Sequence, residues 1–134
     1  MIERDYIMRM IAQLAAVLAK IMGAKKTQNY AEALQIAQNA YDQLFGLTGE
    51  LVDRMDAATL ALVLGDKEKA KALASVLQEE GDLLILQGKI SEGYSKYEKA
   101  LALYGEAQRL STATDEECQA AIAALQAKLA EPCE

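Results

Sequence analysis

Histidine and tryptophan are absent from this sequence, and its 134 residues include one proline, one phenylalanine and two cysteines. Histidine is the commonest general base and a frequent metal ligand, so its absence removes the side chain on which much acid–base and zinc chemistry depends. No glycine-rich phosphate loop is present, and Cys118 and Cys133 lack the spacing of a zinc site. We therefore expect no catalytic residue, no metal and no cofactor.

Two cysteines are also too few for a disulfide framework, which favours a reducing cytoplasm as the compartment. Cys118 falls on an apolar helical stripe and is expected in the core as a small apolar residue. Cys133 lies in the terminal Glu-Pro-Cys-Glu. Chain ends of this kind are seldom packed, so residues 131–134 are expected to be frayed.

Alanine and leucine supply 44 of the 134 residues, a composition typical of close-packed helices. No segment alternates between apolar and polar residues with a period of two, so a sheet is not expected. The length suits one domain and is too short for two ordinary ones. The sequence predicts a single all-α domain over residues 1–134.

The formal net charge of −6 argues against one class of partner. Nucleic-acid binding depends mainly on clustered lysine and arginine side chains that neutralise phosphates. We therefore expect no nucleic-acid partner.

The segment 6–22 is nearly all apolar and resembles a signal sequence or a membrane span. A narrow polar stripe nevertheless runs along it at helical spacing, and the residues before it are mixed in charge rather than basic. We therefore expect no membrane span but a helix with an unusually wide apolar face. One neighbouring helix cannot cover such a face, so we expect a homo-oligomer, most simply a homodimer, with its contact at Ile7, Ile11 and Leu18.

Apolar residues at helical spacing predict about six helices in antiparallel pairs, with short turns at 25–27, 46–49, 65–66, 88–89 and 111–113. The first helix is expected to run from Glu3 to Met22 and to stop at Gly23. The third is expected over 50–64 and the fourth over 67–87. The fourth helix is apolar on all sides near its end, so its first half should pack on the third helix and its second half on the fifth. The expected N-caps are Thr27, Asp66, Ser91 and Thr114, the last in a capping box with Glu117.

From Gly81 to Gly105 the spacing resembles the tetratricopeptide repeat, a helix–turn–helix unit of about 34 residues. The matching positions are small residues where the helices touch, a turn glycine and an aromatic residue, namely Gly81, Leu84, Gly88, Gly93, Tyr97 and Ala100. Weaker echoes occur at Ala33, Ala37 and Ala40, and again at Ala70, Ala74 and Leu77. The resemblance implies an irregular right-handed stack of helix pairs, in which Gly81 contacts Gly93. An ordinary helical bundle is the alternative.

The opening segment, residues 3–23, also resembles the start of a group of short helical proteins from Gram-positive bacteria. That group has no assigned activity, so this second resemblance implies no function.

The resemblance to tetratricopeptide repeats implies a non-catalytic scaffold that binds a protein or peptide through the first helix of each pair. In the clearest unit the candidate face is Gln78, Glu79, Glu80, Asp82 and Gln87. These residues include no lysine or arginine, so the partner should be basic or neutral. The alternative function is a small ligand-binding protein or enzyme that uses carboxylates and tyrosines between helices. For the cluster of Glu79, Glu80 and Asp82, the simpler interpretation is a solvated helix edge. For Tyr94, Tyr97 and Tyr104 it is a partly buried core stripe.

Overall fold

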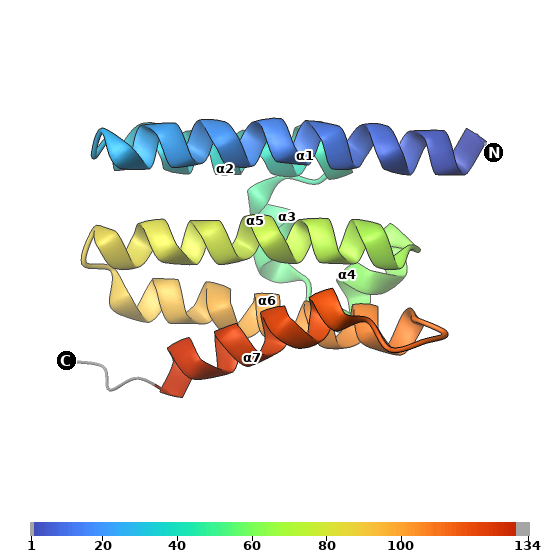
Figure 1. The fold of residues 1–134 in the computed structure, drawn as a ribbon. Helices are drawn as coiled ribbons and strands as arrows, with labels where there is room; N and C mark the ends of the chain where they lie inside the picture. Colours follow the sequence, from blue (N-terminus) through green and yellow to red (C-terminus); the bar gives the residue numbers. More distant parts are fainter. Residues whose placement is uncertain (1, 131–134) are drawn as a thin grey trace.

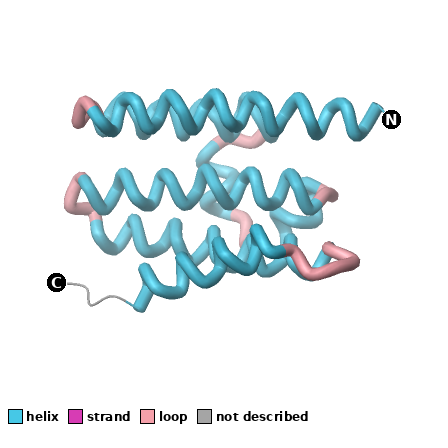
Figure 2. Tube along the Cα trace, in the orientation of Figure 1, coloured by secondary structure: helices cyan, strands magenta, loops and turns pink. Residues whose placement is uncertain are grey.

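The computed structural model describes residues 2–130, which form seven α-helices and no strand. The chain is therefore all-α, as its composition predicts, and short loops join its helices (Figures 1 and 2). The helices are α1 (Ile2–Lys26), α2 (Tyr30–Phe45), α3 (Gly49–Arg54), α4 (Ala57–Leu64), α5 (Lys67–Leu86), α6 (Ile90–Leu110) and α7 (Glu116–Ala130). Cys133 and the predicted frayed end lie outside the described residues.

Helix α5 is central to the arrangement, because it packs against α1, α2, α4 and most extensively α6 (Figure 1). Its buried positions surround the helix rather than forming one stripe, since Ala72, Leu73, Ala74, Val76 and Leu77 are all at most 3% exposed. A helix that is apolar on every side requires neighbours on every side. The remaining contacts place α1 beside α2 and α7 beside α6.

The turn before α2 and the turn before α6 have the same backbone geometry, 60 residues apart. Gln28 and Gly88 are left-handed, with φ values of 60° and 83°. The next residues, Asn29 and Lys89, have φ/ψ of −92°/65° and −91°/69°. Their amides donate to the carbonyls of Ala24 and Leu84, both at 2.8 Å. The same local structure therefore joins α1 to α2 and α5 to α6.

Two helix boundaries differ from the predicted ones. The helix expected over 50–64 is interrupted at Met55, because the side chain of Asp56 accepts from the amide of Thr59 at 2.8 Å and starts α4 as its N-cap. Helix α1 continues past Gly23 to Lys26, since nothing in the chain requires this glycine to leave the helical conformation. The packing also differs, because α4 contacts α6 more extensively than it contacts α5.

Of the four predicted N-caps, Asp66 is confirmed, since it accepts from the amides of Glu68 and Lys69. The other three predictions are wrong by one or two residues. Thr27 ends α1 by donating to the carbonyl of Ala24 at 3.0 Å. The corresponding N-caps are Asn29 for α2 and Lys89 for α6, and Asp115 accepts from the Cys118 amide at 3.1 Å at the start of α7.

The predicted contact between Gly81 and Gly93 is present where α5 meets α6. A Cβ atom on Gly81 would lie 3.0 Å from the carbonyl oxygen of Gly93 and 2.8 Å from the ring of Tyr97. A Cβ atom on Gly93 would lie 2.9 Å from the carbonyl oxygen of Gly81. The two backbones approach so closely that only glycine fits at either position.

Alanine at these two positions should therefore destabilise the fold. We expect Gly81→Ala and Gly93→Ala each to lower the free energy of unfolding by about 1–3 kcal/mol, the usual cost of overpacking a core. Gly105→Ala is the matched control, because this glycine lies inside α6 with nothing within 4 Å of a new Cβ. It should raise the free energy by about 0.5–1 kcal/mol. Urea unfolding followed by circular dichroism measures all three, and equal stability of all three variants would contradict the close contact.

Candidate functional site

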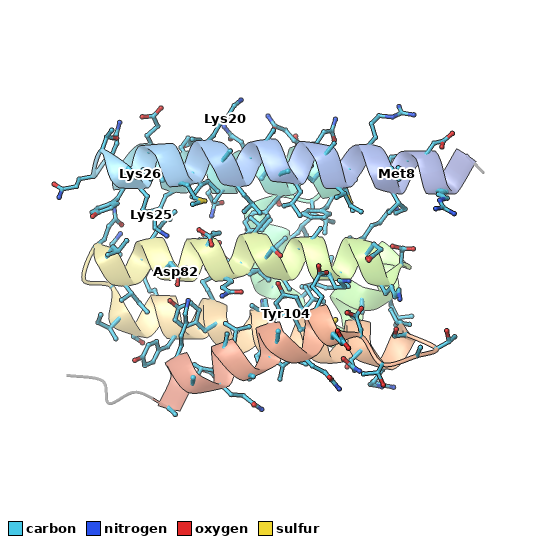
Figure 3. All side chains as sticks on the ribbon, in the orientation of Figure 1. Met8, Lys20, Lys25, Lys26, Asp82 and Tyr104 are labelled. Carbon is cyan, nitrogen blue, oxygen red and sulfur yellow. The ribbon has the colours of Figure 1, made fainter. Side chains whose placement is uncertain are left out.

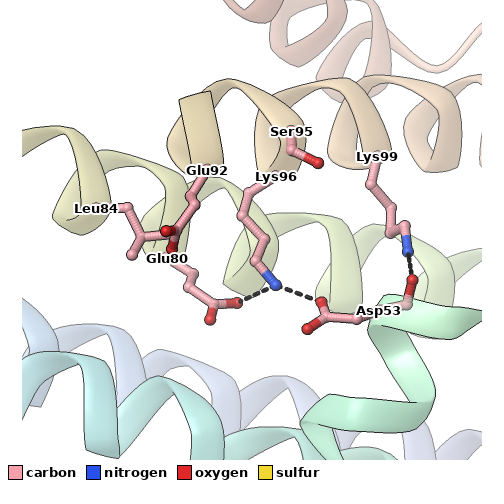
Figure 4. Close-up of a pocket in the computed structure, with 7 residues that line it drawn as sticks. All are labelled: Asp53, Glu80, Leu84, Glu92, Ser95, Lys96 and Lys99. Carbon is pink, nitrogen blue, oxygen red and sulfur yellow. Dashed lines mark hydrogen bonds and ion pairs between the residues drawn. The ribbon is translucent and has the colours of Figure 1, made fainter. Parts of the chain in front are cut away.

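A pocket of about 340 Å³ opens between α3, α5 and α6 (Figure 4). Most of the side chains around it are charged, although the pocket lies beside the apolar core. Its lining residues are Asp53, Glu80, Leu84, Glu92, Ser95, Lys96 and Lys99.

Glu80 is the buried acidic group of this pocket, with 4% of its surface exposed. Its carboxylate accepts hydrogen bonds from the side chains of Gln38 and Tyr41 on α2. The ammonium of Lys96 on α6 lies 3.4 Å from Glu80 Oε1. Burial and the neighbouring Glu80 carboxylate raise the pKa of the Tyr41 hydroxyl far above its usual value, so Tyr41 remains a donor.

The two lysines of the pocket bind the short helix α3 to α6. Lys96 forms an ion pair with Asp53 as well as with Glu80 (Figure 4). Lys99 Nζ donates to the backbone carbonyls of Val52 and Asp53, both at 2.8 Å, and so caps the C-terminal end of α3. Burial lowers the pKa of Lys99, against the opposing effect of Asp53. This network therefore connects α2, α3, α5 and α6 through side chains that satisfy one another.

The five residues of the predicted partner-binding face do not share one exposed surface. Gln78 and Glu79 are half-buried, and Gln87 is exposed at the C-cap of α5. Glu80 is buried in the network described above, so the interpretation as a solvated edge is wrong for this residue. Asp82 is half-buried toward α6 and α7.

The three carboxylates of this segment point to different neighbouring helices. Glu79 Oε1 lies 3.6 Å from Lys25 Nζ on α1. Asp82, labelled in Figure 3, lies on α5. It accepts from the hydroxyl of Tyr97 on α6 and from Lys128 on α7, the latter at 3.0 Å. Within residues 2–130 there is no group of three or more Asp, Glu or Cys side chains placed to hold a metal ion.

The tyrosines of α6 belong to the core more than to a ligand surface. Tyr97 and Tyr104 are 4% and 5% exposed. Burial and the hydrogen bond to Asp82 raise the pKa of Tyr97 above its usual value. The hydroxyl of Tyr104 shares a hydrogen bond of 2.9 Å with Ser75 on α5. Each buried hydroxyl thus has a partner on α5.

A second hollow, here called the inner groove, lies between α1, α5, α6 and α7 and has a volume of about 380 Å³. Lys71 is its central cation and lies 3.1 Å from Glu68, 3.2 Å from Asp115 and 2.7 Å from Glu117. Burial lowers the pKa of Lys71, but hydrogen bonds to these carboxylates outweigh that effect and raise it. The groove is lined by Ile11, Leu14, Glu68, Lys71, Ala72, Ser75, Tyr104 and Glu117.

Sequence reasoning did not identify either Lys71 or Lys96 as a site residue. Asp115 is 44 residues from Lys71, and Asp53 is 43 residues from Lys96. Each lysine has acidic residues near it on its own helix, as many surface lysines do. Only the packing of the helices shows that a distant carboxylate also contacts it.

The predicted oligomer residues occupy one side of α1. Ile7 and Leu18 are half-buried, while Ile11 is 45% exposed and lines the inner groove. The segment Arg4–Lys26 is also long and apolar enough to cross a membrane, with a mean hydropathy of 1.5 and 17% of the apolar window buried. Core helices and signal sequences meet the same criteria of length and composition, so the absence of a span stays a prediction.

Among the described residues, the helices around α5 define an all-α protein with an apolar core, in which the buried Glu80 carboxylate and its partners link α2, α5 and α6. The chain belongs to a family of unknown function, DUF6483, whose pattern matches residues 1–121. No curated protein and no solved structure matches the chain.

The hydrogen bond from Tyr41 to the buried Glu80 should contribute measurably to stability. We expect Tyr41→Phe to lower the free energy of unfolding by about 1.5–3 kcal/mol, the usual value of a hydrogen bond to a charged group. Tyr6→Phe is the control, because Tyr6 is 47% exposed, and it should change the free energy by less than about 0.5 kcal/mol. Chemical denaturation at pH 7 compares the two. Equal stability of the two variants would mean that the hydrogen bond from Tyr41 to Glu80 does not contribute to the free energy of unfolding.

Asp115 should make stability depend on pH through both its cap and its pair with Lys71. The hydrogen bond from the Cys118 amide, with Lys71 nearby, lowers the pKa of Asp115 below its usual value. A lowered folded pKa gives stability that is present above the unfolded pKa of about 3.9 and is lost as pH falls through the folded pKa.

We therefore expect Asp115→Asn, which keeps a capping side chain, to flatten the fall in stability from pH 5 to pH 3. Asp115→Ala should in addition cost about 1 kcal/mol at pH 7, because it removes the cap. Urea unfolding at pH 7, 5, 4 and 3 measures both effects. A pH profile of Asp115→Asn that is parallel to that of the wild type would exclude a role for this carboxylate.

Proposed function

We propose that this protein is a non-catalytic helical scaffold that holds a basic amphipathic segment of another protein in the inner groove. The observation that carries the proposal is the composition of that groove. Apolar side chains of α1 and α5 form its walls, and Glu68, Asp115 and Glu117 surround the one ammonium of Lys71.

The fold supports this proposal through its two identical turns. We propose that α1–α2 and α5–α6 are two antiparallel units of a tetratricopeptide-like stack, with α3 and α4 inserted between them and α7 as the closing helix. The matched turns at Gln28 and Gly88 and the contact of Gly81 with Gly93 support this assignment. In stacks of this kind the first helix of each unit lines the inner surface, and α1 and α5 supply six of the eight residues that line the inner groove, with one each from α6 and α7.

The charge of the groove defines the chemistry of the partner. Two carboxylates, Glu68 and Glu117, and one lysine line the groove, and Asp115, whose side chain is 9% exposed, pairs with the same lysine, so an acidic segment would meet repulsion and a basic one attraction. The apolar walls, among them Ile11 and Leu14, fit the apolar stripe of a helix placed in a groove. Together they favour a helical segment with apolar residues on one face and lysine or arginine beside them.

The alternative function is binding of a small ligand, or catalysis, at the pocket beside Glu80. That pocket has a volume of about 340 Å³ and contains a buried carboxylate, two lysines and a serine. Glu80, Lys96 and Lys99 are all engaged with other helices of this chain, however. A ligand would have to displace contacts that hold the buried Glu80, whereas Glu117 in the inner groove keeps 76% of its side chain exposed, which favours a structural role for the pocket.

Binding of designed peptides tests the proposal. The probe is a fluorescein-labelled 18-residue helix with leucine on one face and lysine on the other, and its acidic counterpart carries glutamate in place of lysine. Fluorescence anisotropy should show binding of the basic peptide in the micromolar range and at least tenfold weaker binding of the acidic one. Replacing the leucines by alanine should also abolish binding, because the apolar walls lose their contacts.

Two double variants locate the binding site. Glu68→Gln with Glu117→Gln should weaken binding of the basic peptide at least fivefold. Glu50→Gln with Glu106→Gln removes the same two charges from carboxylates that pair with arginines on their own helices, and it should leave binding unchanged. If both double variants weaken binding equally, the attraction is general and the groove is not the site.

A further inference from the structure

The polar side chains that line the inner groove are a lysine, a serine, a tyrosine and two glutamates. An ionised carboxylate only accepts hydrogen bonds, whereas an ammonium has three hydrogens to donate and a hydroxyl has one. The lysine, the serine and the tyrosine therefore carry every hydrogen that these side chains could donate to a bound segment, here called the guest. Whether those hydrogens are free decides which groups of the guest the groove can receive.

Lys71 has already committed its three hydrogens. Its ammonium lies 3.1 Å from Glu68 Oε1, 3.2 Å from Asp115 Oδ2 and 2.7 Å from Glu117 Oε1. Three acceptors at these distances match the three N–H donors of a lysine. A guest therefore cannot accept a hydrogen from Lys71 without breaking one of these ion pairs.

The two hydroxyls of the groove are committed as well. Ser75 has one hydrogen, and the backbone carbonyl oxygen of Lys71, which can only accept, lies 3.1 Å from Ser75 Oγ. Because that hydrogen is used within α5, Ser75 is the acceptor in its 2.9 Å contact with the hydroxyl of Tyr104 on α6 (labelled in Figure 3). Tyr104 therefore donates its single hydrogen to Ser75, and neither hydroxyl has another to offer.

The groove retains only the capacity to accept. Glu68 and Glu117 each use Oε1 for Lys71, and the Oε2 atom of each forms no hydrogen bond within residues 2–130. The oxygen of Tyr104 donates to Ser75 and keeps its own lone pairs. Glu117 is 76% exposed, so a guest can reach its free oxygen. The groove thus presents acceptors from α5, α6 and α7 and no free side-chain donor.

We infer that the inner groove anchors its guest through one inserted arginine side chain, whose guanidinium donates to the free oxygens of Glu117 and Tyr104. This inference rests on the proposed function and adds to it the identity of the anchoring residue. A guanidinium has five N–H donors and no acceptor, so it matches a groove that has acceptors only. Its donors form a rigid planar fork, which suits acceptors that lie on two different helices.

Tyr104 and Glu117 are close enough to each other for their charges to interact. Burial is the main cause of the raised pKa of Tyr104, and the nearby Glu117 carboxylate adds to that rise. The two free acceptors therefore belong to one region of the groove, although they lie on α6 and α7.

The rest of the groove suits the other parts of an arginine side chain. Ile11, Leu14 and Ala72 offer apolar surface to its stem. A guanidinium is also more weakly hydrated than an ammonium, so its transfer into a partly enclosed groove costs less than the transfer of a lysine. Lys71 is a cation in the same groove, but the three carboxylates around it leave the charge there negative.

Other polar side chains of a guest fit the groove less well. Glutamine and asparagine each bring a carbonyl oxygen, which would face acceptors and find no donor. A trimethylated lysine keeps its positive charge but has no N–H, so it retains the attraction and loses the hydrogen bonds. This last group separates recognition by charge from recognition by donors.

Three versions of the labelled 18-residue basic helix test the inference. They carry lysine, arginine or trimethyl-lysine at every cationic position, so their charge is equal while their N–H donors differ. Fluorescence anisotropy should show at least threefold tighter binding of the arginine peptide than of the lysine peptide. The trimethyl-lysine peptide should bind at least tenfold more weakly than the lysine peptide. Circular dichroism of the free peptides checks that their helix content is equal.

Tyr104→Phe tests whether the guest donates to this hydroxyl oxygen. The variant should weaken binding of the arginine peptide at least threefold and change binding of the trimethyl-lysine peptide by less than twofold. Tyr97→Phe is the matched control, because Tyr97 is an equally buried tyrosine of α6 whose hydroxyl donates to Asp82 outside the groove. It should leave binding of both peptides unchanged. A purely structural effect of Tyr104→Phe would instead weaken all three peptides alike.

The outcomes distinguish this inference from the proposed function. If no basic peptide binds, both are overturned. If trimethyl-lysine and lysine peptides bind equally, charge alone attracts the guest, and only the inference is overturned. Equal affinity for arginine and lysine, or a Tyr104→Phe variant that affects all three peptides to the same extent, would also overturn the inference alone. The peptide series uses the wild-type chain, so it remains decisive even if Tyr104→Phe does not fold.

Discussion

The burial of the Glu80 carboxylate is the constraint on which the arrangement of four helices depends. A buried charge without partners costs several kcal/mol, so α2 must place Gln38 and Tyr41 against it and α6 must place Lys96 beside it. The next residue, Gly81, lets the backbone of α6 approach closely enough for that lysine to reach. One turn of α5 therefore determines the position of α2 on one side and of α6 on the other.

The same network accounts for the short helix α3, which lies between α2 and α4. Helix α3 has six residues, too few for a helix to be stable by itself. Its C-terminal carbonyls accept from Lys99, and its Asp53 pairs with Lys96, so α6 supplies the bonds that α3 cannot make internally. The matched turns at Gln28 and Gly88 are 60 residues apart, more than the roughly 34 residues of one tetratricopeptide repeat. The helices inserted between α2 and α5 account for the difference.

The sequence was sufficient to predict features that depend on residues close together in the chain. Small residues at helical spacing predicted the contact of Gly81 with Gly93, and an aspartate after a glycine predicted the N-cap at Asp66. The break at Met55 was missed because no glycine or proline marks it, and only the capping geometry of Asp56 causes it. The role of Glu80 could not be predicted, because its partners on α2 lie 39 and 42 residues away and a glutamate at the edge of an apolar stripe usually faces water. Whether the five predicted partner-binding residues recognise anything stays a prediction.

The two outermost helices of the fold differ in a way that packing alone does not require. Helices α1 and α7 each have neighbours on one side, so each leaves part of its surface in water. Helix α7 fills that surface with glutamate, glutamine and alanine, and none of the large exposed apolar side chains of the described residues lies on it. Four of them lie on α1, namely Tyr6, Met8, Ile11 and Met22. A helix whose only task is to close a fold needs a polar outer side, as α7 has. The folding of one chain therefore does not require the apolar outer side of α1, which sets this helix apart from α7.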